Sequence, residues 1–93
     1  MRFARPPDGF RLLIDEGIEA YIGAWAAGSV ERRRAWRDIK DRLRIVAARE
    51  GSDRGKNRFV MTFRDQPRDG DLIRVAYVIH AESVHVLSVF CKP

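Results

Sequence analysis

The sequence predicts an α+β domain of order β-α-α-β-β-β, in which a helical hairpin packs on a small, mainly antiparallel sheet. Apolar residues recur at helical spacing through residues 15–49. A short strand pattern precedes them at 10–14, and three strand patterns follow at 58–64, 72–80 and 84–91. The polar, Gly-containing stretch 49–58, and the turns "QPRDGD" and "AES", separate these later elements.

The first strand, "FRLLI", follows the breakers Pro6, Pro7 and Gly9. Asp15 is the expected N-cap of the first helix, Gly28 its end and Ser29 the cap of the second helix. The first helix has one apolar face: Ile18, Tyr21, Ile22 and Trp25.

The second helix has an apolar stripe and a basic row on different sides. The stripe, expected in the core, is Val30, Trp36, Ile39, Leu43 and Val46. The basic row is Arg33, Arg37, Lys40 and Arg44.

The last two strands are apolar on both faces, which is typical of strands that are central in a sheet or covered on both sides. In the strand at 72–80, Arg74 interrupts this apolar pattern. Because side chains alternate along a strand, Arg74 lies on the face opposite to Ile73, Val75, Tyr77 and Ile79, which we expect against the helices. Arg58 and Arg64 join the face of Arg74 if the neighbouring strands keep register.

The net charge of +5 is concentrated in the middle third of the chain. Residues 31–64 carry twelve basic and five acidic side chains, whereas each flanking third has one more acid than base. Fifteen of the eighteen basic residues are arginine, whose planar fork suits phosphate. This pattern fits either a polyanion-binding surface or ordinary solvated helix faces.

Ninety-three residues fit one domain, 1–93. A single cysteine, Cys91, cannot form an internal disulfide, which favours a reducing cytoplasm. No apolar run suits a signal peptide or a membrane span, so we expect a cytoplasmic protein with no membrane partner. Ligand spacing predicts no metal site and the Gly pattern no cofactor.

Two of these strands resemble the RelE/ParE superfamily of bacterial type II toxins. "DLIRVAYVI" is similar to the family's third-strand pattern "gxYRvxYxv", and "SVHVLSVFCKP" to its closing "vxVlxvxxK". The element order also matches over nearly the whole chain. The resemblance implies a small basic toxin, inactivated by a cognate antitoxin, that cuts mRNA in the ribosomal A site or, in the ParE branch, inhibits DNA gyrase.

The resemblance also implies roles for single residues. Arg74 matches the arginine that ribonuclease members use to stabilise the scissile phosphate. The paired lysines of some nucleases would fall near Val60 and Thr62, which cannot replace them, and the residues after the last strand have only Lys92 as a counterpart. Apart from the resemblance, His80 and His85 are candidate general bases only because histidine titrates near neutral pH; the alternative is that both are partly exposed strand histidines with no special role.

Three functions follow from these observations. The first is a ribosome-dependent endoribonuclease with Arg74 as catalytic residue and a nucleic-acid-binding set of Arg54, Lys56, Arg58, Arg64 and Lys92. The second is a non-catalytic, gyrase-inhibiting toxin of ParE type. The third is a basic domain of the same fold that binds RNA or an acidic protein and is not toxic.

Overall fold

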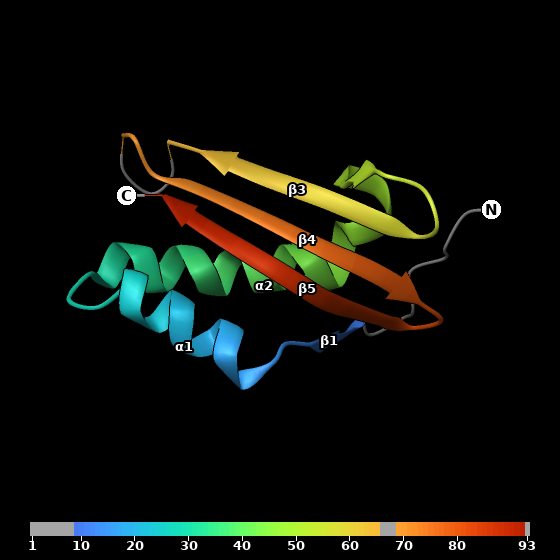
Figure 1. Cartoon of the computed structure of the whole chain (residues 1–93), viewed down its shortest axis with the longest axis horizontal. Coiled ribbons are helices and arrows are strands. Elements are labelled where there is room, and N and C mark those ends of the chain that lie inside the picture. The colour runs from blue at the N-terminus through green and yellow to red at the C-terminus, as the bar shows by residue number, and fades with distance from the viewer. Residues whose placement is uncertain (1–8, 66–68, 93) are drawn as a thin grey trace.

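The computed structural model describes residues 9–65 and 69–92, and these form two layers (Figure 1). One layer is the helical pair α1 (Glu16–Trp25) and α2 (Val30–Glu50). The other is a five-stranded sheet of order β1-β5-β4-β3-β2. Its strands are β1 (Arg11–Leu13), β2 (Ser52–Asp53), β3 (Arg58–Arg64), β4 (Leu72–His80) and β5 (Ser83–Lys92).

The sheet is antiparallel except at one edge, where β1 runs parallel to β5. The predicted α+β architecture is confirmed, including the strand at 10–14. The sequence missed β2, in which Ser52 pairs with Val60 and Asp53 with Phe59. This two-residue strand is held by backbone bonds at the sheet edge and has no apolar alternation that a pattern could reveal. The turn expected at 66–71 lies partly outside the described residues.

The predicted cap of α2 is present, because the backbone N–H of Arg32 donates to the Ser29 hydroxyl at 3.1 Å. Asp15 occupies the N-cap position of α1 without a side-chain cap bond. The first helix ends at Trp25, before Gly28. Gly28 lies instead in the turn between the helices with φ of 76°, a conformation that glycine adopts without strain.

The core lies between α2 and the helix-facing side of the sheet. As predicted, Ile73, Val75, Tyr77 and Ile79 are buried there, at 1% exposure or less. From α2 come the buried residues Trp36, Ile39, Leu43 and Ala47.

Two residues assigned to the core are in fact exposed. Val30 is 57% exposed. It lies six residues before Trp36, about 120° away around the helix, and so outside the buried stripe. Tyr21 is 44% exposed along its ring. Its hydroxyl is nevertheless engaged at the end of β5, where it accepts from the N–H of Cys91 at 3.0 Å and donates to the carbonyl of Cys91 at 3.3 Å.

A buried ion pair joins the start of α2 to the start of β4. Arg32 donates through Nη2 and Nε to the two carboxylate oxygens of Asp71, at 2.8 and 3.2 Å. The same guanidinium donates to the carbonyl of Trp25 at 3.0 Å and lies 4.6 Å from the centre of its ring. Asp71 is 3% exposed, and this fork fixes the chain three residues before Arg74.

At the other end of α2, Tyr77 connects the helix to the sheet. Its hydroxyl donates to the carbonyl of Ala47 at 2.7 Å, and its ring stacks on Phe59 with centroids 5.7 Å apart. Gly51 passes directly over this hydroxyl, so that a Cβ there would clash with it. The position needs glycine because of this close approach, since its φ of −70° suits any residue.

No helix of residues 9–65 and 69–92 combines the length and the apolar character that a membrane crossing requires.

Candidate nucleic-acid interface

The face of the sheet that turns away from the helices is open and carries the candidate site (Figure 1). Alternation of burial along β3, β4 and β5 defines this face, which we call the open face. Its basic members are Arg58, Arg64, Arg74 and Lys92, all of them exposed.

Arg74 lies in β4, the central strand of the sheet. Its direct partners are Thr62 on β3 and Phe90 on β5, which places their Cβ atoms about 4.5–5.5 Å away. Leu72, two positions before Arg74 on β4, pairs with both Arg64 and Lys92. Each of these cations is therefore a diagonal neighbour of Arg74 at about 7–8 Å. These three cations therefore surround one point at the end of the open face.

The remaining predicted binding residues form a separate group around the connection from β2 to β3. Arg58 pairs with Val78, four residues along β4 from Arg74, or about 13 Å. The tight loop before it is held by a bond from the N–H of Arg54 to the carbonyl of Arg58 at 2.7 Å, and Lys56 adopts a positive φ of 54°. The predicted set is thus divided between two ends of the sheet.

Neither histidine is close to Arg74. His80 lies six residues from it along β4, about 20 Å, and His85 pairs with Val78, about 13 Å away. Both distances exceed what a general base needs, which is hydrogen-bond contact with the proton that it removes. Val60 and Thr62 occupy the facing stretch of β3 and cannot accept a proton near neutral pH.

The cations around Arg74 are not neutralised by the carboxylates of the described residues. Among the described residues, ion pairs join Arg32 to Asp71, Lys40 to Glu19 and Arg42 to Glu50. None of these pairs lies on the open face. The described residues also contain no cluster of metal-ligating side chains. The site can therefore bind and stabilise an anion, but its own residues supply no proton carrier beside Arg74.

Comparison with known proteins addresses the fold. No protein-family model matches the chain, and no curated protein matches it. Among solved structures, the chain is similar to a mutant of the E. coli toxin RelE in the free state, with a TM-score of 0.56 and 19% identity over 87% of this chain and 81% of that chain. The chain has a RelE-like fold. The resemblance expected from "DLIRVAYVI" is confirmed at the level of structure.

The sequence did not reveal two exposed apolar side chains on β5, Phe90 and Leu87. Phe90, which pairs with Arg74, is 50% exposed, although the apolar pattern of β5 indicated burial. A register shift opposite Ala76 and Tyr77 also leaves Leu87 47% exposed on β5. Neither exposure was predictable, because a bulge changes which side chains face outward without changing the apolar pattern.

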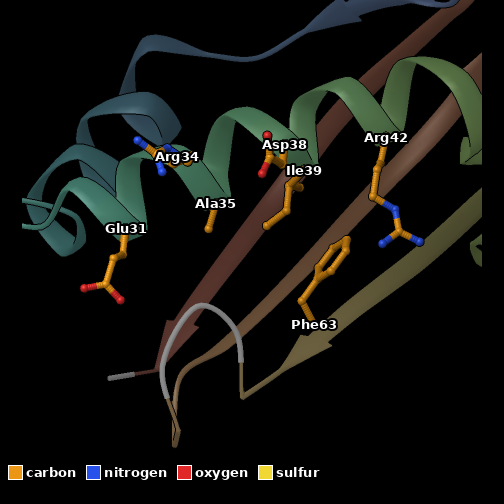
Figure 2. Close-up of a pocket in the computed structure, with 7 residues that line it drawn as sticks. All are labelled: Glu31, Arg34, Ala35, Asp38, Ile39, Arg42 and Phe63. Carbon is orange, nitrogen blue, oxygen red and sulfur yellow. The ribbon is translucent and has the colours of Figure 1, made fainter.

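A hollow of about 540 Å³ lies on the helix-facing side of the sheet, between α2 and β3 (Figure 2). In Figure 2 Ile39 and Arg42 point from the helix toward Phe63, and the Arg42 guanidinium lies 5.6 Å from the centre of that ring. The charged residues that line the hollow are two acids and two arginines, Glu31, Asp38, Arg34 and Arg42. The hollow is therefore electrically balanced, unlike the end of the sheet around Arg74.

Cys91 lies on the helix-facing side of β5, between Phe90 and Lys92, and is 8% exposed. Burial raises the pKa of its thiol to about 11. At pH 8 the thiolate should then be about 100-fold scarcer than for an ordinary thiol. A thiolate of higher pKa is also more nucleophilic, so we expect iodoacetamide to react about 10- to 100-fold more slowly with the folded protein. Alkylation rates with and without denaturing urea test this, and the rate in the folded protein should rise with pH toward 11. Similar rates in both conditions at pH 8 would show that the strand end is open.

Proposed function

We propose that this protein is the toxin of a type II toxin-antitoxin pair and a ribosome-dependent mRNA endoribonuclease of RelE type. The observation that carries the proposal is the position of Arg74 on the central strand of the sheet, where it faces outward with Arg64 and Lys92 as diagonal neighbours. The RelE-like fold supports it. In this proposal Arg74 is the catalytic residue, and Arg54, Lys56 and Arg58 bind the RNA backbone farther along the face.

The chemistry follows from the charges. When a ribose 2′-hydroxyl attacks the adjacent phosphate, negative charge grows on the phosphate oxygens before the 5′-oxygen leaves. The guanidinium of Arg74 can donate two parallel N–H groups to such oxygens, and β4 fixes the position of its backbone. Phe90 offers a half-exposed ring beside it on which a base can stack, an interaction of about 1–3 kcal/mol.

The protein's own residues do not provide a general acid or base for this reaction, because His80 and His85 are too far from Arg74. The proposal therefore makes the ribosome part of the active site, supplying the mRNA in a reactive conformation and the groups that move protons. On this basis free RNA should be cut far more slowly than mRNA bound in the A site.

A gyrase-inhibiting toxin of ParE type is the second candidate. The exposed apolar side chains Leu87 and Phe90 on the open face favour it, because exposed apolar groups beside arginine are typical of protein-binding surfaces. In either case we infer that a cognate antitoxin covers the toxin. A chain with net charge +5 suits an acidic partner.

Expression of the unmodified protein in cells without an antitoxin tests these candidates. We expect growth arrest, new 5′ ends within translated mRNA and unchanged DNA supercoiling. Co-expression of the product of an adjacent acidic, helix-rich reading frame should restore growth. Growth arrest with altered supercoiling and intact mRNA would favour the ParE type, and harmless expression would reject both toxins in favour of a non-toxic RNA- or protein-binding domain.

A further inference from the structure

Three adjoining hollows follow the side of α2 opposite to the hollow of Figure 2. The first, of about 290 Å³, lies between α1 and α2 and shares Arg37 and Lys40 with the second. The second, of about 450 Å³, lies between α2 and β1 and shares Arg11 and Arg44 with the third, of about 640 Å³. Because each hollow shares its walls with the next, they make one continuous groove.

The groove is lined by the basic row of α2, continued by Arg11 of β1. The members of this row on α2 are three or four residues apart, so they lie one above another on one side of the helix. From Arg33 to Arg44 the row extends about 16 Å along the helix axis. Four cations from α2 and one from β1 thus line a shallow channel.

Few carboxylates oppose these cations. Lys40 lies 3.8 Å from Glu19, and it is the only member of the row in an ion pair among residues 9–65 and 69–92. Asp41 and Glu82 also line the channel but pair with none of the arginines. The groove therefore keeps a surplus of positive charge, whereas the opposite hollow is balanced.

The walls of the groove favour a phosphate backbone over an acidic protein segment. A protein interface needs a pocket for a large apolar or aromatic anchor. Here both aromatic residues in the wall are buried. Phe10 is 1% exposed, and Trp36, 7% exposed, is covered by Lys40 at 5.7 Å and donates its Nε1–H to Glu19 at 3.0 Å. Regularly spaced guanidinium groups without such an anchor suit repeated phosphates and read no base sequence.

We propose that this groove binds the phosphate backbone of an RNA strand and is a second RNA site, on the helical layer, separate from the open face. It depends on neither the nuclease nor the gyrase proposal. The protein would then contact RNA through the open face of the sheet and, on the opposite side, through the groove of the helical layer. Such an arrangement suits a protein that binds between two RNA segments.

The test compares two double variants for binding to a single-stranded RNA about 12 nucleotides long. Arg37→Gln with Arg44→Gln removes two cations of the groove, whereas Arg34→Gln with Arg49→Gln removes two exposed arginines from other sides of the same helix. For each lost phosphate contact the slope of log K against log salt should fall by about 0.7. The groove variant should therefore lose about 1.4 from the slope and bind about 25-fold more weakly at 0.1 M salt.

The RNA affinity of the control variant should stay within about two-fold of that of the unmodified protein. The control variant has the same net charge as the groove variant, so a difference between the two reflects the position of the lost charges. Circular dichroism melts confirm that both variants fold. Equal losses in both variants would mean that only total charge matters and would overturn the proposal, as would binding by the groove variant equal to that of the unmodified protein. Poly-glutamate of matched charge that binds as tightly as the RNA, and loses as much in the groove variant, would assign the groove to an acidic protein instead.

Discussion

Arg74→Ala is expected to abolish mRNA cleavage on ribosomes while leaving ribosome binding within a few-fold of the unmodified protein. The side chain of Arg74 makes its strongest interaction with charge that develops only in the transition state, so its loss lowers the rate and not the affinity. Removal of one such donor typically costs about 100- to 1,000-fold in rate. Mapping of mRNA 5′ ends after induction, together with ribosome co-sedimentation, measures the two effects separately.

Arg58→Ala is the matched control for this experiment, because it removes an exposed arginine from the same face about 13 Å away. It should weaken binding slightly and keep cleavage. Arg74→Lys retains the charge but loses the planar fork, and should recover only part of the activity. Truncation of an exposed strand residue without a function would change stability by about 0–1 kcal/mol and nothing else. Equal toxicity of equally folded Arg74→Ala and unmodified proteins would remove Arg74 from the site.

Gly51→Ala is expected to produce the largest loss of stability. Alanine is compatible with the backbone here and would by itself stabilise the chain by about 0.4–1 kcal/mol, because it restricts the unfolded state. The clash of the new methyl group with the Tyr77 hydroxyl outweighs this gain. Overpacking costs about 1–3 kcal/mol, and displacement of the hydroxyl from the Ala47 carbonyl adds the cost of a lost buried hydrogen bond, about 1–3 kcal/mol. Urea unfolding measures the sum.

The same clash predicts that the two positions are coupled. Tyr77→Phe alone should destabilise by about 1–2 kcal/mol, because it leaves the Ala47 carbonyl without its donor. In the double variant the methyl group occupies the space of the missing hydroxyl, so the combined loss should be smaller than the sum by about 1–3 kcal/mol. Additive losses would show that the chain at Gly51 moves away from Tyr77 without cost.

The fold was predictable from the sequence because its main elements have strong local patterns. Apolar spacing located α2, and alternation located β3 and the helix-facing side of β4. Elements defined by tertiary contacts were less predictable. The two residues of β2 depend on the edge of β3, and Tyr21 is held by a backbone bond to Cys91 rather than by burial of its ring.

The candidate site was predictable only in part. Strand alternation placed Arg74 on the open face, but register decided that Arg64 and Lys92 lie beside it and that Arg58 does not. Register also decides how far His85 lies from Arg74, whereas the distance to His80 follows from their separation along β4. The basic groove needed the tertiary structure, because Arg11 comes to the row on α2 only when β1 joins the sheet beside β5.

The parallel pairing of β1 with β5 has a consequence for synthesis of the protein. The two helices and the β3–β4 hairpin involve contacts between neighbouring segments, and these can form early on the nascent chain. The β1 edge cannot close until β5 is made, since Arg11 of β1 pairs with Ser83, far along the chain. Phe90 and Lys92 also reach the side of Arg74 only then. The surface proposed to act on translating ribosomes is therefore complete only after β5 has joined β4.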